Sequence, residues 1–302
     1  MCVTCGCSEG AETTLTNPAV LGSVETIVPS HTHVLPDGTV ITHSHNDHPH
    51  HDHDHHHHAD DRHHPSHHDH HPRLITQAAQ AHGTTITLEQ NLLAKNDLIA
   101  AQNRGWFKGR NILALNLVSS PGSGKTTLLT RTIQDLQNRM TISVLEGDQA
   151  TTHDAQRIRE TGCDVVQINT GTGCHLEAAM IERGLTALNP PLDSIVMIEN
   201  VGNLVCPALF DLGETAKVVI LSVTEGEDKP VKYPHMFRAS QVMILSKIDL
   251  LPHLDFEVDR CLDYARQVNP HLTVFQVSAK TGEGLEAWYE WLLQGGSSEL
   301  GQ

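Results

Sequence analysis

Ser119-Ser120-Pro121-Gly122-Ser123-Gly124-Lys125-Thr126-Thr127 is the stretch that decides the fold. An apolar run over residues 112–118 precedes it, and a helical pattern begins at Leu128. A strand that leads into a glycine-containing loop, with Lys-Thr at the start of a helix, is the local context of a phosphate-binding loop. The sequence therefore predicts a nucleotide site at this loop.

The residue types of this loop suit a polyphosphate with a metal ion. Glycines let backbone N–H groups approach an anion, and a helix start adds positive potential. The lysine can reach the terminal phosphates, and the Thr126 hydroxyl can bind Mg²⁺. The usual G-x-x-x-x-G-K-[ST] pattern has glycine where this chain has Ser119, so a turn without a ligand remains an alternative for the loop alone. The predicted nucleotide-binding residues are Gly122, Ser123, Gly124, Lys125, Thr126 and Thr127.

Short apolar segments alternate with helix-length patterns through the rest of the chain. The apolar segments span residues 142–145, 164–168, 195–198, 218–223, 242–245 and 273–277. The helical patterns span residues 152–160, 176–188, 256–268 and 285–293. This alternation predicts an α/β fold with a doubly wound, mainly parallel sheet, whose ligand lies at the carboxyl ends of the strands.

Composition divides the chain into four parts. We expect a cysteine-rich metal motif over 1–10, a histidine-rich disordered linker over 11–72, the nucleotide-binding domain over 73–295 and a flexible tail over 296–302. The domain should begin with a helix that starts near the capping-box pair Thr87 and Gln90 and ends near Gly105.

The overall composition excludes several function classes. The 302 residues are 38% hydrophobic, and no apolar run approaches the length that crosses a bilayer. A formal net charge of −16 argues against a nucleic-acid partner. The N-terminus lacks the pattern of a signal peptide, so we expect a cytoplasmic protein without a membrane partner. Its seven cysteines then suggest metal ligands rather than disulfides.

The N-terminal region predicts transition-metal binding. Cys2, Cys5 and Cys7 (the N-terminal cysteine motif) can surround one Zn²⁺, Ni²⁺ or Cu⁺ ion, although a redox-active thiol pair stays open as an alternative. Residues 31–71 hold 18 of the 24 histidines. Such a tract cannot form an apolar core, and it predicts weak, multiple binding of metal, with an expression tag as the alternative.

Acidic residues and a glycine follow the predicted strands. A phosphoryl-transfer site needs carboxylates that hold Mg²⁺ together with Thr126, and a glycine N–H near the γ-phosphate. Asp154 and Glu199 are the predicted magnesium ligands, Gly202 is the predicted glycine, and Asp148 is predicted to orient water. Taken singly, each acid is also consistent with a helix cap. The predicted catalytic set is Lys125, Thr126, Asp148, Asp154, Glu199 and Gly202.

Two later strand ends predict a guanine site. Asp249 can accept hydrogen bonds from N1–H and the exocyclic amine of guanine, a donor pair that adenine lacks. Lys247 is expected to lie against the base, and Ser278, Ala279 and Lys280 are expected to offer backbone N–H groups. The usual pattern is Asn-Lys-x-Asp, so Ser246 in place of asparagine is expected to lose a side-chain contact.

A second metal site is predicted inside the domain. Cys174 and His175 follow the third strand, and Cys206 follows the fourth. These three residues (the internal cluster) can bind one metal ion if their loops converge, and a fourth ligand could come from water or from a second subunit. The alternative is that they pack as small buried residues. Leu250 and Leu254 are candidate dimer contacts, with core packing equally open. Cys163 and Cys261 are expected to pack.

The combination of these motifs resembles the HypB family of GTPases that assist nickel delivery to [NiFe]-hydrogenase, and the resemblance extends over nearly the whole chain. The motifs that carry it are the N-terminal cysteine motif, the histidine tract, residues 119–127, Gly147-Asp148 with Asp154, residues 173–175, residues 199–207 and residues 226–230.

The resemblance implies a function and partners. By resemblance, the N-terminal cysteine motif is a tight nickel site, and the internal cluster is a weaker nickel or zinc site at a GTP-dependent homodimer interface. The implied cofactors are GTP, Mg²⁺, Ni²⁺ and Zn²⁺, and the implied partners are a HypA-type metallochaperone and the hydrogenase large-subunit precursor. A nickel or zinc storage protein with incidental nucleotide hydrolysis, and a GTPase for zinc or cobalt, are the alternatives.

Overall fold

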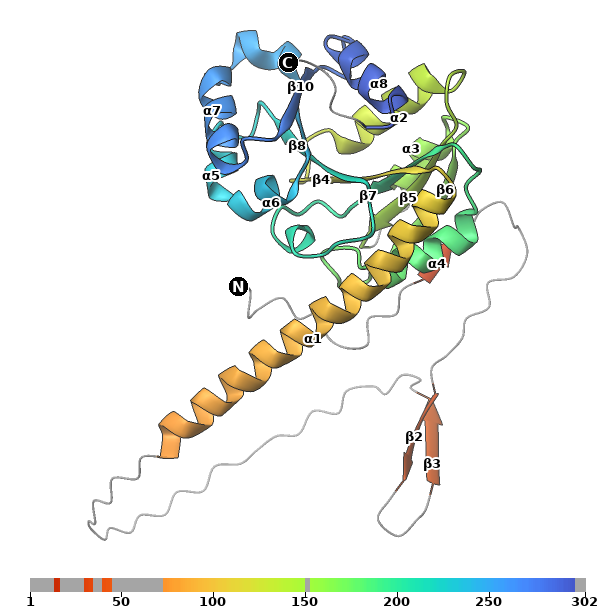
Figure 1. Cartoon of the computed structure of the whole chain (residues 1–302), viewed down its shortest axis with the longest axis vertical. Helices are drawn as coiled ribbons and strands as arrows, with labels where there is room; N and C mark the ends of the chain where they lie inside the picture. The colour runs from red at the N-terminus through yellow and green to blue at the C-terminus, as the bar shows by residue number, and fades with distance from the viewer. Residues whose placement is uncertain (1–13, 17–29, 35–39, 45–72, 150–152, 297–302) are drawn as a thin grey trace, which may run out of the picture. The chain divides into compact units, whose positions relative to one another are not determined.

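A computed structural model describes residues 14–16, 30–34, 40–44, 73–149 and 153–296, with side chains described from Gln90 onward (Figure 1). The chain divides into two units, one of residues 19–82 and one of residues 1–18 with 83–302. The smaller unit contains an antiparallel pair, β2 (Ser30–Val34) and β3 (Val40–Ser44), in which Thr32 lies opposite Thr42.

The larger unit is built on one eight-stranded sheet with the order β1-β6-β5-β7-β4-β8-β9-β10. The strands are β1 (Thr14–Thr16), β4 (Leu113–Ser119), β5 (Ile142–Asp148), β6 (Asp164–Asn169), β7 (Ile195–Glu199), β8 (Ala216–Ser222), β9 (Val242–Ser246) and β10 (Thr273–Val277). Strands β4 to β10 are parallel, and β1 pairs antiparallel with β6 at the edge. The predicted doubly wound, mainly parallel sheet is confirmed.

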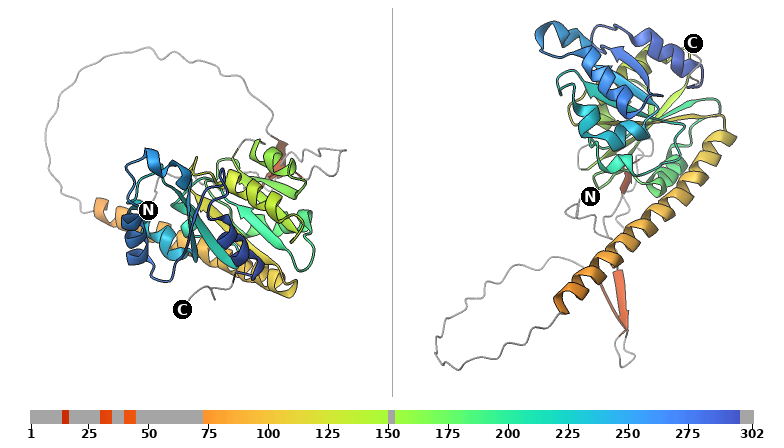
Figure 2. Two further views of the ribbon diagram at one scale, coloured as in Figure 1. Left: turned by 90° about the horizontal axis from the view of Figure 1, so that it is seen from above. Right: turned by 60° about the vertical axis from the view of Figure 1, so that its left-hand side comes forward.

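Helices cover both faces of the sheet (Figure 2). They are α1 (Arg73–Gly109), α2 (Lys125–Leu136), α3 (His153–Arg159), α4 (Ala178–Leu188), α5 (Lys229–Lys232), α6 (Pro234–Ala239), α7 (Val258–Val268) and α8 (Leu285–Leu293), with 3-10 turns η1 (Cys206–Ala208) and η2 (Ile248–His253). Alternate side chains of β4 face opposite ways: Leu115 packs with α2 and α8, whereas Ala114 packs with α1 and α4. This alternation is why the central strand is buried throughout.

The first helix differs from its prediction. It runs without a break over Arg73–Gly109, so Thr87 and Gln90 lie inside the helix and do not cap it. Leu92 on this helix is 51% exposed. The helix packs through the buried Ala100 and Phe107 and through two buried amides. Asn96 donates to Asp211 O at 2.7 Å, and Asn103 donates to Ala178 O and Leu212 O at 2.9 and 3.1 Å.

The structure describes only parts of residues 1–72 and none of residues 297–302. Strands β1, β2 and β3 fall within residues 11–72, where the sequence predicted disorder; their β-branched residues, such as Val40 and Ile41, favour extended backbone. The N-terminal cysteine motif, most of the histidine tract and residues 297–302 of the predicted tail lie outside the described residues. Across the described helices, none combines the length and apolar character needed to span a membrane.

Candidate functional site

The predicted phosphate loop joins the end of β4 to the start of α2. Gly122 and Gly124 have φ angles of 76° and 95°, a left-handed conformation that favours glycine and turns the backbone around the loop. The loop forms one wall of a cavity of about 530 Å³ at the carboxyl ends of the strands. Residues 119–127 line it together with Glu146, Gly147, Asp148, Gln149, Asp154, Arg157, Glu199, Asn200, Val201, Gly202 and Lys247. The cavity therefore gathers the whole predicted catalytic set.

Glu199 is the centre of this cavity's polar contacts. Its Oε1 accepts hydrogen bonds from Lys125 Nζ at 2.9 Å and from Thr126 Oγ1 at 2.6 Å. The carboxylate is 1% exposed, and its Oε2 has no hydrogen-bond partner among the described residues. An unpaired buried carboxylate oxygen beside a threonine hydroxyl is a donor set that suits Mg²⁺, which prefers oxygen ligands.

The other predicted acids lie at the rim. Asp148 Oδ1 accepts a hydrogen bond from the backbone N–H of Gln149 at 2.8 Å. Asp154 forms an ion pair with Arg157 at 3.5 Å, one helical turn along α3. Arg157 also donates to Thr127 Oγ1 at 3.3 Å, so a guanidinium lies against the phosphate loop. Sequence reasoning missed Arg157, because an arginine in a short polar helix carries no signal of its own.

Glu146 is a second residue that the sequence analysis left unassigned. The pairing of β5 with β7 places it directly beside Glu199. It is 2% exposed, and burial, with a further contribution from the charge of Glu199, raises its pKa to about 8. A carboxyl group inside an otherwise apolar strand was the available signal, because such a residue is rarely buried without a role.

Gly202 lies against the phosphate loop. A Cβ atom at this position would be 3.1 Å from Pro121 Cγ and 3.2 Å from Pro121 N, closer than nearly all real Cβ contacts. The preceding Asn200 is anchored to the sheet through its N–H, which donates to Leu117 O at 3.0 Å. The absence of a side chain thus lets the segment after β7 approach the loop closely.

A smaller cavity of about 300 Å³ adjoins the loop and contains the predicted guanine residues Lys247, Asp249, Ala279 and Lys280. Ser278 Oγ donates to Asp249 Oδ1 at 2.6 Å and so connects the 278–280 loop to that carboxylate. Lys247 lies across the loop, with Nζ donating to Gly122 O at 2.7 Å. The geometry is compatible with a purine base between the lysine and the 278–280 loop.

Ser246 makes a side-chain contact with the phosphate loop. Its buried hydroxyl donates to Ser123 O at 2.7 Å, across 123 residues of sequence. Ser246 is the last residue of β9, and it lines the smaller cavity together with Ser123 and Gly124. Serine therefore keeps a connection between the base-binding segment and the phosphate loop.

The three residues of the internal cluster converge as predicted. Their ligand atoms lie within 4.8 Å of one another, with Cys174 Sγ 3.1 Å from Cys206 Sγ and 3.7 Å from His175 Nδ1. The two cysteines are partly exposed and the histidine is buried. Two thiols and an imidazole are ligands that suit Ni²⁺ and Zn²⁺, and three residues leave room for a fourth ligand.

His175 is held in place by packing. Its ring lies against Phe210, with the ring centroids 4.0 Å apart, and Nε2 is 3.7 Å from Glu177 Oε1. Burial lowers the pKa of His175 to about 4, so the imidazole is neutral at physiological pH, as a metal ligand requires. The remaining described cysteines do not share this setting: burial raises the pKa of Cys163 and of Cys261 to about 12.

Two hydrogen bonds connect the internal cluster to the segment that follows Glu199. Asn200 Oδ1 accepts from Leu176 N at 3.2 Å, and Asn203 Nδ2 donates to Cys174 O at 3.2 Å. Gly147, beside the phosphate cavity, leaves no space for a Cβ against Leu176, where the nearest atom would be at 2.7 Å. The cluster and the cavity thus share one continuous set of contacts.

Comparison with known proteins agrees with this architecture. The family model described as CobW/HypB/UreG, nucleotide-binding domain, matches residues 113–276. The hydrogenase maturation factor HypB of Rhizobium leguminosarum bv. viciae is 61% identical over 207 residues, which are 68% of this chain and 69% of that protein. The chain belongs to the HypB family.

Other HypB proteins give the same result. HypB of Escherichia coli K12 is 56% identical over 209 residues, covering 68% of this chain and 71% of that protein. Among solved structures, HypB of Archaeoglobus fulgidus superposes with a TM-score of 0.62 at 37% identity, covering 66% of this chain and 97% of that one. HypB of Helicobacter pylori in complex with nickel has a TM-score of 0.62 at 40% identity, covering 66% and 94%. These matches span about two thirds of the chain. The resemblance had been expected to extend over nearly the whole chain, from Cys2 onward.

Proposed function

We propose that this HypB-family chain is a GTP-hydrolysing nickel metallochaperone that delivers nickel for [NiFe]-hydrogenase maturation in the cytoplasm. The observation that carries the proposal is the connection of the internal cluster to Glu199 through Asn200 and Leu176. A nucleotide cavity and a soft-metal site that share one loop are the parts that a nucleotide-gated metal carrier needs.

The nucleotide part rests on the donor geometry of the phosphate loop. In the proposal, Lys125 and Thr126 leave Glu199 Oε1, which both now contact, and take up phosphate and Mg²⁺. Thr126, Asp154 and Glu199 would hold Mg²⁺, which would supply charge neutralisation at the transferring phosphate. Asp148 would orient the attacking water, and Asp249 would select guanine.

In this proposal nickel is carried and released by the protein and is not a permanent cofactor. Cys174, His175 and Cys206 would bind one Ni²⁺ or Zn²⁺ ion, and the N-terminal cysteine motif would hold a second ion more tightly. The exposed apolar side chains beside the cluster, Val205 at 49% and Leu209 at 59%, support a homodimer whose second subunit completes the coordination.

The two predicted dimer contacts, Leu250 and Leu254, differ in their exposure to solvent. Leu250 packs partly into the core, whereas Leu254, after η2, is 39% exposed. The dimer interface would therefore include Leu254 rather than both leucines equally. The further partners of the proposal are a HypA-type metallochaperone and the hydrogenase large-subunit precursor.

Metal release during turnover tests the proposal. Full-length protein loaded with nickel is mixed with GTP or with a non-hydrolysable analogue in the presence of a colorimetric chelator. The proposal predicts nickel release with GTP only, at the rate of hydrolysis. Release at one rate with GTP, with the analogue and without nucleotide contradicts gating.

The alternative is a nickel or zinc storage protein with incidental nucleotide hydrolysis, favoured by the 18 histidines of residues 31–71. Removing residues 1–72 separates the two. Storage predicts that hydrogenase maturation in cells is lost at every nickel level, whereas gated delivery predicts maturation that recovers when nickel is added.

A further inference from the structure

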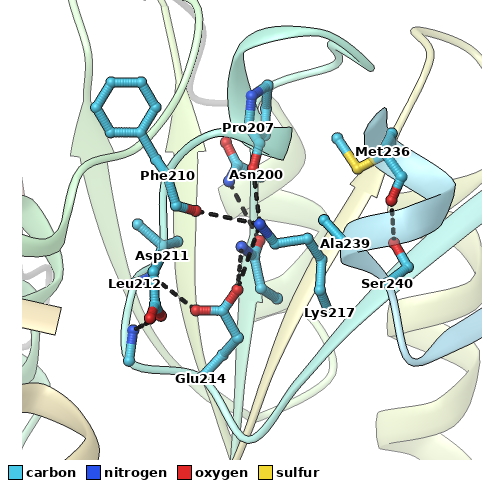
Figure 3. A network of polar contacts seen from close by, with 12 residues as sticks. Asn200, Pro207, Phe210, Asp211, Leu212, Glu214, Lys217, Met236, Ala239 and Ser240 are labelled. Carbon is cyan, nitrogen blue, oxygen red and sulfur yellow. Dashed lines mark hydrogen bonds and ion pairs between the residues drawn. The ribbon is translucent and has the colours of Figure 1, made fainter. Parts of the chain in front are cut away.

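A chain of buried polar side chains crosses the sheet from the nucleotide segment to the segment that carries Cys206 (Figure 3). Asn200 Nδ2 donates to Asn116 Oδ1 at 3.2 Å, and Asn116 Nδ2 donates to Glu214 Oε1 at 3.1 Å. Glu214 Oε1 in turn lies 3.6 Å from Lys217 Nζ. The register of β4 with β8 places Asn116 opposite Lys217, and Glu214 contacts both side chains.

The charged pair in this chain is deeply buried. Lys217 is 5% exposed and Glu214 is 8% exposed, while the neighbours of Lys217 on β8 are apolar. A buried ion pair is weak evidence for added stability, because desolvation offsets its attraction and an apolar pair of similar size does as well. We therefore ask which part of the structure the pair holds in place.

Lys217 fixes the segment that surrounds the internal cluster. Its Nζ donates to Pro207 O at 2.8 Å and to Phe210 O at 3.1 Å. Pro207 directly follows the ligand Cys206, and the Phe210 ring lies 4.0 Å from the ring of His175. The Lys217 ammonium group thus holds the backbone next to Cys206. It also holds the backbone of Phe210, whose ring packs against His175.

The opposite end of the chain meets the nucleotide segment. Asn200 follows Glu199, whose Oε1 now accepts from Lys125 and Thr126. Phosphate competes with Glu199 for the Lys125 ammonium, and Mg²⁺ binds the Thr126 hydroxyl oxygen, so nucleotide binding changes the contacts of Glu199. Because Asn200 bonds both Leu176 N and Asn116, a shift at Glu199 changes the contacts on both sides of the cluster.

We propose that Lys217 is a positioning residue for the internal cluster, and that the relay Asn200–Asn116–Glu214 transmits the nucleotide state to it. This inference rests on the proposed function, which supplies the nucleotide and the metal. Lys217 sets the position of Cys206 and Phe210, and the relay makes that position depend on the contacts of Glu199.

The test measures nickel binding in the full-length chain with Cys2, Cys5 and Cys7 replaced by serine. The thiolate-to-nickel charge-transfer absorption then reports on the internal cluster, because histidine-bound nickel lacks that band. Lys217→Met alone would leave Glu214 buried without its counter-charge, so the variant is the neutral pair Lys217→Met with Glu214→Gln. Ser240→Ala is the control: its buried hydroxyl donates to Met236 O at 2.9 Å, near the network but outside it.

The double variant is expected to bind nickel at the internal cluster about tenfold more weakly, and its GDP affinity is expected to stay within about twofold of the parent. The Ser240→Ala control is expected to keep the parent's nickel affinity even if its melting temperature falls. Parental nickel affinity in the double variant overturns the positioning role of Lys217.

Asn116→Val isolates the relay, because it leaves the contacts of Lys217 with Pro207 and Phe210 in place. This variant is expected to keep the parent's nickel affinity with GDP and to lose the difference between GDP and a GTP analogue. An unchanged difference overturns the relay. If the parent itself shows no difference, the proposed function fails and the relay with it, while the positioning role is still decided by the double variant.

Discussion

Cys174 Sγ and Cys206 Sγ lie 3.1 Å apart, although 32 residues separate them in the chain. The two thiols come from loops that follow β6 and β7, the strands on either side of β5 in the parallel sheet. Asn200 Oδ1, which accepts from Leu176 N, and Asn203 Nδ2, which donates to Cys174 O, connect those loops. The two sulfurs are close enough for one metal ion to contact both. The arrangement connects the internal cluster to the segment that lines the cavity at the phosphate loop.

Cys206→Ser should abolish thiolate-bound nickel at the internal cluster. In a chain whose N-terminal cysteine motif is replaced by serine, the charge-transfer absorption should disappear, because one remaining thiol and an imidazole bind Ni²⁺ too weakly. The matched control is Cys163→Ser, whose thiol donates to Ile142 O at 3.0 Å. Absorption that survives Cys206→Ser, or that is lost with Cys163→Ser, would place the nickel elsewhere.

Gly202→Ala should weaken nucleotide binding. The new Cβ would lie 3.1–3.2 Å from Pro121 and push the segment after β7 away from the phosphate loop, with a cost of about 1–3 kcal/mol. We expect the affinity for a GTP analogue to fall about tenfold in a titration. Gly105→Ala is the control, because a Cβ there meets nothing within 4 Å and alanine favours the helix. Equal affinities in the two variants would show that the close approach has no role.

Ser246→Ala should lower GDP affinity by a factor of about five, because Ser123 O loses a buried hydrogen bond worth about 1 kcal/mol. Ser240→Ala deletes an equally buried hydroxyl that bonds Met236 O instead, and it should leave GDP affinity unchanged. Isothermal titration of both variants with GDP and GTP checks the difference. The contact with the phosphate loop is unimportant if both variants bind like the parent.

The metal-free protein should lose stability on mild acidification because of His175. Its pKa is lowered to about 4 in the folded state, below its ordinary value near 6.5, so the unfolded chain takes up a proton first as the pH falls. Between pH 7 and pH 5 this contributes a loss of roughly 2 kcal/mol in the free energy of unfolding.

Urea unfolding of the parent and of His175→Gln, in the presence of a chelator, measures this contribution. The variant keeps Glu177 and Cys174, each at 3.7 Å from a ring nitrogen of His175, so the other titrating groups at the site are the same. The variant should lose less stability between the two pH values. Equal losses would mean that His175 is accessible to protons in the folded state.

The sequence predicted the central sheet well, since each parallel strand is a short apolar run and its buried faces leave little freedom. The convergence of Cys174 with Cys206 followed from strand order, because parallel strands end at one edge. The predicted start of α1 near Thr87 was wrong, because a capping-box pair such as Thr87 and Gln90 also fits inside a continuous helix.

The polar contacts that organise the site could not be read from the sequence. Lys217 contacts Pro207 and Phe210, and Arg157 contacts Thr127, through pairings that depend on register and on loop paths. A lysine within an apolar strand resembles a surface residue until its partners are known. Ser246 shows the same limit, because its departure from the usual asparagine concealed a contact that the folded chain retains.

If the segment from Glu199 to Cys206 couples nucleotide to metal, the nickel affinity of the internal cluster depends on which nucleotide is bound. The full-length chain with Cys2, Cys5 and Cys7 replaced by serine is titrated with Ni²⁺ in saturating GDP and in a saturating, non-hydrolysable GTP analogue with Mg²⁺. We expect nickel dissociation constants that differ by about 5- to 150-fold between the two states, and by linkage the same ratio for nucleotide affinity with and without nickel. Equal dissociation constants in the two nucleotide states would contradict this coupling.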